Sequence, residues 1–210
     1  MTAEAFTNLE EISPLYAGLM EEVKRRVDVI ISVLNRVHPL PLIVAVELCY
    51  LQLRKIVEMI ALACLAAHGD ILDTKANFLQ KAYNADHITN QLGKLHPDFF
   101  PIPGEQRLDP LTQRPVEVVR LTSGFLSKDD LLNLYGKCGD YLHRGSLRQI
   151  IMNRELNFDF EKIALWTDQI IKLLNHHQIQ TSHPDTMLWV LMNDKEDGQV
   201  KCFPMRRINL

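Results

Sequence analysis

The segment from Pro41 to Ala67 constrains the fold of this chain more than any other. Its apolar residues recur almost all round a helical wheel, and helices of that kind are buried. A transmembrane helix needs about 18 or more nearly uninterrupted apolar residues, and polar side chains interrupt this segment too often. The 41–67 segment is therefore predicted to be the central helix of a globular domain. The interrupting residues are Glu47, Gln52, Arg54, Lys55 and Glu58.

Composition limits the class of protein. The chain has 210 residues, 47% hydrophobic and 23% charged, which is typical of a globular domain with its own core. Its net charge of -3 provides no overall attraction to nucleic acid or to an anionic membrane, so binding of RNA would need a local basic patch. The first residues lack the pattern of a secretory signal, and the four cysteines form no CxxC pair. We expect a cytoplasmic protein with no membrane partner.

Four further amphipathic patterns predict helices around the central one. Ser13-Pro14 and Ser127 with Asp130 provide start signals for two of them. We therefore expect a mainly α fold, a helical bundle of about five helices that forms one domain over residues 1–180. The apolar positions of the four patterns run from Tyr16 to Leu34, from Ala76 to Leu92, from Leu131 to Leu142, and through a helix at about 159–178.

Two segments do not fit a helical bundle. Five prolines between 97 and 115 predict a proline-rich insertion over about 95–126. Residues 116–121, toward its end, have the pattern of a short strand. At the end of the chain, Met187–Met192 and Val200–Phe203 flank a turn that contains Gly198. This pattern predicts a C-terminal β-hairpin, an appendage over 181–210 that packs on the same domain.

A polar line crosses the otherwise apolar 41–67 helix. Arg54 and Glu58 lie about 20° to either side of Glu47 on the helical wheel. Buried charges are costly unless they are paired or hydrated, so this line should face a cleft, a partner or a polar helix. An internal ion pair that fixes the helix register explains the same residues, and the sequence leaves both interpretations open.

The helix that begins near Ser127 carries a second polar group. Lys137, Asp140 and His143 follow one another at about 60° steps and so lie on one arc, and Arg144 is four residues from Asp140. Cations in a last helical turn complement the helix dipole without any function. Alternatively, a histidine with a pKa near 6.5 can act as general acid or base while lysine and arginine hold a phosphate. Both interpretations remain open at this point.

Two sequence segments match a known pattern when taken together. They are Leu53-Arg-Lys-Ile-Val-Glu58 and Tyr135-Gly-Lys-Cys-Gly-Asp-Tyr-Leu-His-Arg144. This pair of segments resembles the HEPN superfamily. HEPN domains are all-α and often dimeric, and they occur in bacterial toxin, defence and RNA-processing systems. Active members carry an arginine, usually a polar residue next, and a histidine after four to six intervening residues, at a dimer cleft where RNA is cleaved without metal. Here Lys137 and His143 have five residues between them, with lysine in place of arginine and Cys138 in place of the polar residue.

The resemblance implies a site and a function. Lys137 and His143 would be catalytic, with Arg144, Asp140, Arg54 and Glu58 in the substrate-binding site. The protein would be a HEPN-like RNA-binding homodimer, with metal-independent ribonuclease activity of a defence or toxin-type system left open.

The alternative is a non-enzymatic, dimeric protein-interaction module with a degenerate site, whose partner is another protein. No cofactor or metal site is expected, since there is no phosphate-binding glycine loop. The spacing of His176, His177, His183 and Cys202 matches no compact zinc site either.

Overall fold

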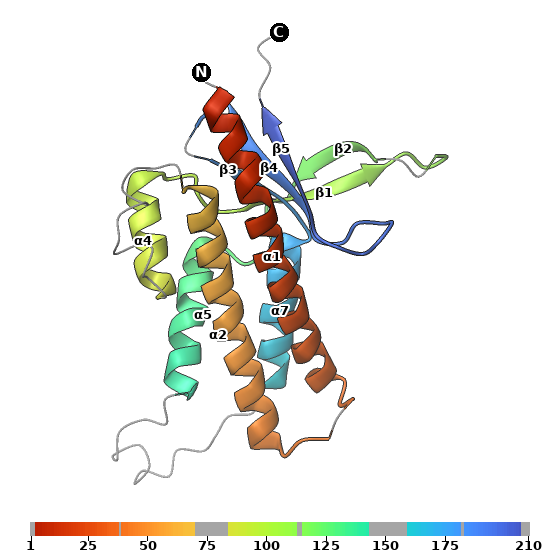
Figure 1. Cartoon of the computed structure of the whole chain (residues 1–210). Helices are drawn as coiled ribbons and strands as arrows, with labels where there is room; N and C mark the ends of the chain where they lie inside the picture. The colour runs from red at the N-terminus through yellow and green to blue at the C-terminus, as the bar shows by residue number, and fades with distance from the viewer. Residues whose placement is uncertain are drawn as a thin grey trace.

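The computed structural model describes residues 3–37, 39–69, 84–112, 115–142, 159–181 and 183–206, with side chains from residue 12 onward. A layer of helices packs against one face of an antiparallel sheet (Figure 1). The helices are α1 (Ala3–Leu34), α2 (Leu42–Ala67), α4 (Ala85–Leu95), α5 (Lys128–Leu142) and α7 (Phe160–Leu174). The strands are β1 (Ile102–Leu108), β2 (Pro115–Arg120), β3 (His176–Gln180), β4 (Thr186–Leu191) and β5 (Lys201–Arg206).

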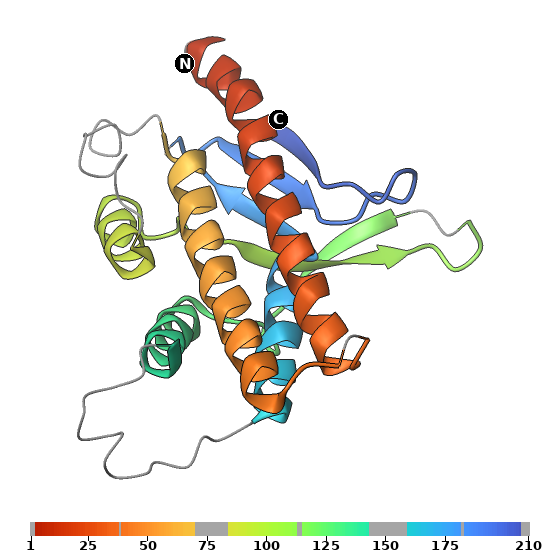
Figure 2. The same cartoon turned by 60° about the horizontal axis from the view of Figure 1, so that its bottom comes forward.

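The prediction of a central helix is confirmed by α2. It packs against α1, α4, α5 and α7, and half of its residues are buried (Figure 2). Pro41 precedes its first turn, where the missing amide hydrogen costs nothing. On its more polar side, Arg26 of α1 donates to both Glu22 and Gln52 and so links α1 to α2.

Of the two start signals, the one at Ser127 was correct and the one at Ser13-Pro14 was late. Ser127 caps α5, since its hydroxyl accepts a hydrogen bond from Asp130 N over 3.2 Å and donates to the Asp130 carboxylate. Asp159 caps α7 through Lys162 N. By contrast, α1 begins at Ala3 and continues through Pro14, ahead of the predicted start. The first part of the helix expected from Ala76 lies outside the described residues, and the rest corresponds to α4.

The prediction of a mainly α bundle with a single hairpin is wrong, because the fold is α+β. The hairpin itself is confirmed as β4 and β5, but these strands belong to a five-stranded sheet in the order β2-β1-β3-β4-β5. β1 lies inside the proline-rich segment. Pro103 has no N–H to donate there, but its carbonyl accepts a hydrogen bond from Leu121 N. β3 begins at His176, whereas the helix expected at about 159–178 was to continue to 178.

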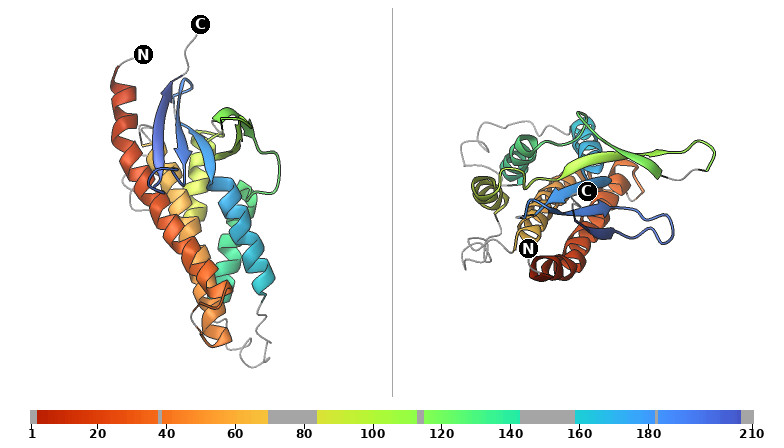
Figure 3. Two further views of the ribbon diagram at one scale, coloured as in Figure 1. Left: turned by 90° about the vertical axis from the view of Figure 1, so that its right-hand side faces the viewer. Right: turned by 90° about the horizontal axis from the view of Figure 1, so that it is seen from above.

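One face of the sheet is packed on the helices. Ile179, Leu188 and Val190 point into the shared core, and β5 lies beside α1 (Figure 3). Two bonds from α1 hold the loop before β5: Lys24 donates to the Gly198 carbonyl, and Glu21 accepts from Val200 N over 2.6 Å. Strands from the middle and from the end of the chain thus share one core with the helices.

Among the residues described, no helix is both long enough and apolar enough to cross a membrane.

Candidate functional site

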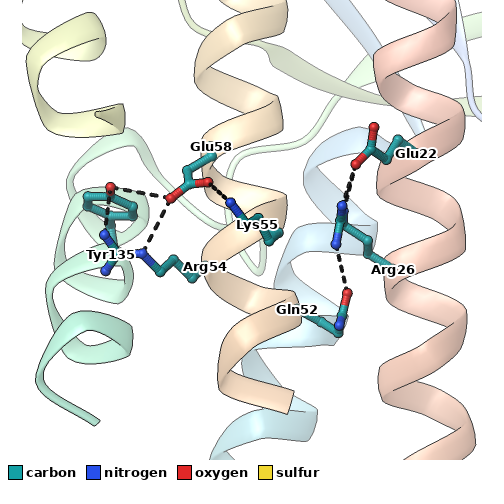
Figure 4. A network of polar contacts seen from close by, with 7 residues as sticks. All are labelled: Glu22, Arg26, Gln52, Arg54, Lys55, Glu58 and Tyr135. Carbon is teal, nitrogen blue, oxygen red and sulfur yellow. Dashed lines mark hydrogen bonds and ion pairs between the residues drawn. The ribbon is translucent and has the colours of Figure 1, made fainter. Parts of the chain in front are cut away.

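Two residues of the polar line of α2, Arg54 and Glu58, contact Tyr135 of α5. Arg54 Nε lies 3.3 Å from Glu58 Oε1, and Arg54 Nη2 donates to the Tyr135 hydroxyl over 3.0 Å (Figure 4). The same hydroxyl donates to Glu58 Oε1 over 3.4 Å. Three side chains from two helices therefore close a ring of polar contacts that holds α2 against α5.

The Glu58 carboxylate has several bonding partners because it is buried. Glu58 is only 9% exposed, and a buried carboxylate is costly unless it is bonded. Besides Arg54 and Tyr135, it accepts from Lys55 Nζ over 2.8 Å. The Arg54 guanidinium carbon also lies 4.4 Å from the centre of the Tyr135 ring, within the range of a cation–π interaction. The predicted pair Arg54–Glu58 is thus formed, and its bonds are made inside the fold.

The environment keeps Tyr135 protonated. Burial raises the pKa of its hydroxyl, the Arg54 charge opposes that rise, and the Glu58 charge adds to it. The neighbouring Cys138 is buried on the same helix, and burial raises its pKa to about 12 against a smaller opposing effect of Arg54. At neutral pH Tyr135 is therefore a hydroxyl donor to Glu58, and Cys138 is a neutral thiol without nucleophilic character.

Lys137 lies on a different side of α5 from Tyr135. It is exposed, and its Nζ is 5.4 Å from the centre of the Trp166 ring on α7. Lys162 Nζ lies 5.6 Å from the same ring. The Trp166 ring centre lies 6.1 Å from that of Tyr50, which stacks on Tyr141 with ring centres 4.0 Å apart. Two ammonium groups therefore sit at the edge of one aromatic cluster, where α2, α5 and α7 meet.

The remaining predicted site residues are Asp140, His143 and Arg144. Asp140 is exposed on α5. His143 and Arg144 lie outside the described residues, directly after the last described residue of α5. The structure thus brings Arg54 and Glu58 together and puts Lys137 beside Trp166.

Sequence reasoning missed three residues at these contacts: Tyr135, Trp166 and Lys162. Tyr135 and Trp166 were assigned to apolar stripes, and the signal that could have found them is the polar or cation-binding capacity of a buried tyrosine or tryptophan. Lys162 gave no signal, since a lone surface lysine in a first helical turn is ordinary.

The histidines of β3 do not form a metal centre. His176 and His177 are successive strand residues and so point to opposite faces of the sheet. His177 Nδ1 donates to the Leu174 carbonyl over 2.7 Å, and its Nε2 accepts from the Tyr16 hydroxyl. Within the described ranges, no three histidine, cysteine or acidic side chains are placed to share a metal ion.

Comparison of the chain with protein-family models, with curated proteins and with solved structures found no match.

Proposed function

We propose that this chain is a HEPN-like RNA-binding domain of a defence or toxin-type system, with His143 as the general acid or base of metal-independent cleavage. One observation carries the proposal: the first of the two segments that resemble the superfamily lies on α2, the described part of the second lies on α5, and these helices contact each other. Arg54 and Glu58 of the first segment bond to Tyr135 of the second. Segments separated by about 80 residues in sequence need not meet in space, so this contact supports a shared site.

Local positive charge also favours the proposal. Lys137 and Lys162 approach the same Trp166 ring, and neither forms an ion pair within the described part of the chain. Two unpaired ammonium groups beside one ring attract an anion, and phosphate groups dominate the affinity of nucleic-acid binding. A local patch of this kind is what a chain with a net charge of -3 requires.

The contacts suggest a role for each residue. Arg54 and Glu58 are satisfied inside the fold, so in this proposal they are positioning residues that hold α5 against α2. Lys137 contacts phosphate. Asp140 and Arg144, four residues apart, lie beside the bound strand, and His143 transfers the proton. Because a lysine is a point charge and lacks the planar fork of arginine, we expect weaker orientation of the scissile phosphate and slow cleavage.

The binding part is tested with fluorescein-labelled single-stranded RNA and anisotropy over a series of salt concentrations. Lys137→Ala and Lys162→Ala should each weaken binding, and the slope of log K against log salt should fall by roughly 0.7 for each lost phosphate contact. Lys172→Ala is the matched control, because Lys172 is an exposed lysine of α7 that pairs with Asp168 at 2.7 Å. No binding at low salt, or equal weakening by the control, contradicts RNA binding at this patch.

The catalytic part is tested by incubating wild type and His143→Ala with total RNA in the presence of a chelator. Loss of cleavage in the variant, with RNA binding retained, supports the assignment of His143. Equal cleavage by both proteins, or none by either, removes the catalytic part and leaves the binding part to stand on its own test.

A second candidate is the non-enzymatic dimeric interaction module. It is favoured by Val44 and Leu51, which are 43% and 41% exposed on α2 and share a face because they are seven residues apart. Light scattering should then show a dimer that Leu51→Glu dissociates, while Leu111→Glu, in the exposed loop after β1, leaves it intact. A monomer at all concentrations contradicts this candidate, and a dimer without RNA binding favours it over the first.

A further inference from the structure

The strand β4 is apolar on both of its faces. Leu188 and Val190 point into the core shared with the helices, and the alternate residues Met187, Trp189 and Leu191 point to the outer face of the sheet. An antiparallel strand with one solvated face normally alternates apolar and polar residues. In the described part of the chain helices pack on one face only, and the three outer residues stay partly exposed. The outer face is therefore open to a partner.

The strand registers align the outer residues in rows across the sheet. One row consists of Ile102, Gln178, Trp189 and Phe203, on β1, β3, β4 and β5. Trp189 and Phe203 are thus direct cross-strand neighbours, and Phe203 is 44% exposed. Two aromatic side chains therefore lie next to each other on the open face, with the Gln178 amide beside them.

The Trp189 ring is held in place by His176. Its indole N–H donates to His176 Nε2, and the two ring centres are 5.2 Å apart. Burial lowers the pKa of His176, so the imidazole is neutral near pH 7 and its Nε2 can accept this bond. A ring that is oriented before the ligand arrives loses little conformational entropy on binding. Trp189 is thus a preorganised stacking surface.

The row next to the aromatic pair has a cation at each end. It runs from Arg120 on β2, across β1, β3 and β4, to Lys201 on β5. Four spacings between neighbouring strands separate its ends, about 19 Å along the sheet. Lys201 is bonded to Asp197 at 2.7 Å, but exposed pairs of this kind contribute little and can be exchanged for a phosphate. Among the residues that point outward from the described strands, none is an aspartate or a glutamate.

We propose that the outer face binds single-stranded RNA across the strands, with bases stacked on Trp189 and Phe203 and the backbone along the row from Arg120 to Lys201. RNA is taken as the ligand from the proposed function, on which this assignment rests. Stacking of unpaired bases on aromatic side chains, with cations along the backbone, is typical of single-strand binding. A face without carboxylates, on a chain with a net charge of -3, favours a polyanion over a protein partner.

Anisotropy of a fluorescein-labelled single-stranded RNA, and of the same RNA as a duplex, tests the proposal. The single strand should bind roughly ten-fold more tightly or better, because paired bases cannot stack on the sheet. Phe203→Ala should weaken its binding roughly ten-fold. The control Leu15→Ala, at a position 58% exposed on α1, should leave the affinity unchanged.

The charged end of the row has its own matched pair of variants. Arg120→Ala should weaken binding of the single strand and lower the slope of log K against log salt by roughly 0.7. Arg107→Ala should change neither, because Arg107 points to the other face of the same hairpin and is bonded to Glu117. All of these side chains are exposed, so the fold should be retained, as circular dichroism checks.

Equal affinity of Phe203→Ala and the wild type, or of single strand and duplex, would overturn the proposal. An RNA-free dimer that Phe203→Glu dissociates would overturn it too, since a second copy would then cover the face. If Lys137→Ala abolishes binding and Phe203→Ala does not, the outer face is excluded and the proposed function stands. The opposite result excludes the contact at Lys137 and keeps the outer face, and no RNA binding by the wild type excludes both.

Discussion

The hydroxyl of Tyr16 on α1 donates a hydrogen bond to Nε2 of His177 on β3 over 2.8 Å. The bond is fully buried and joins the first helix to the middle of the sheet. Because the other ring nitrogen donates to the Leu174 carbonyl, the imidazole is neutral with both nitrogens satisfied. The pKa of His177 is lowered to about 4, mainly by burial; the backbone bond to Leu174 opposes this shift and the nearby His176 adds to it.

This buried histidine makes stability depend on pH. In the unfolded chain a histidine titrates near 6.5, so between about pH 6.5 and 4 the unfolded state binds the extra proton. The free energy of unfolding should therefore fall as the pH is lowered through that range, by up to roughly 3 kcal/mol. Urea denaturation at several pH values measures the slope. His177→Gln should flatten it, whereas His87→Gln, at an exposed position on α4, should not. An unchanged slope in His177→Gln would contradict the assignment.

A second prediction concerns the ring formed by Arg54, Glu58 and Tyr135. Arg54→Ala removes a bonding partner of the buried Glu58 carboxylate and should lower the free energy of unfolding by about 1–3 kcal/mol. Tyr135→Phe keeps the aromatic ring under the guanidinium and removes only the hydroxyl, so it should cost about 1 kcal/mol. Chemical denaturation of both variants and of the double variant measures the coupling, expected at about 0.5–1.5 kcal/mol. Additive effects of the two changes would show that the ring is not a unit.

The control for that cycle is Lys172→Ala. Lys172 also forms an i,i+4 pair, with Asp168, but both side chains are about half exposed. Exposed pairs contribute little, so its removal should change stability by less than about 0.5 kcal/mol. A loss as large as that of Arg54→Ala would mean that burial does not distinguish the two pairs.

The sequence predicted what depends on local chemistry. The apolar run of α2, the cap at Ser127 and the Gly198 turn of the β4–β5 hairpin all follow from residues close together in the chain, and the structure confirms them. The pairing of Arg54 with Glu58 follows from the same helical periodicity. Each of these features could be found without knowledge of the tertiary fold.

The features that the sequence did not predict depend on contacts between segments that are distant in the chain. β3 follows α7 after a single residue, and its histidines form a strand because β4 pairs with them along its whole length. The prolines between 97 and 115 predicted an irregular insertion, yet β1 includes Pro103, whose carbonyl accepts a hydrogen bond from Leu121 N. The role of Tyr135 depends on which helix faces α2. Such partners leave no local pattern.

Two glycines offer a matched test of backbone conformation. A Cβ at Gly198 or at Gly136 would meet no atom within 4 Å, so neither change is limited by space. Gly198 has a φ of 69°, a conformation that costs an L-residue about 1–2 kcal/mol, and Gly198→Ala should destabilise the hairpin by that amount. Gly136 lies in the middle of α5, where alanine is the better helix former, so Gly136→Ala should add about 0.5–1 kcal/mol. Thermal denaturation should show opposite signs, and a shift in the same direction would contradict the backbone argument.

Thiol chemistry provides the last prediction. Burial raises the pKa of Cys49 to about 11 and that of Cys138 and Cys202 to about 12, and it raises that of Cys64 as well. Only the thiolate is nucleophilic, so near neutral pH the native protein should react slowly with an aromatic disulfide reagent. Cys202 on β5 is the one partly exposed cysteine and should react first, and Cys202→Ser should remove that phase. In denaturant all four thiols should react at once. Rapid reaction of the native protein would mean that the core opens far more readily than its packing implies.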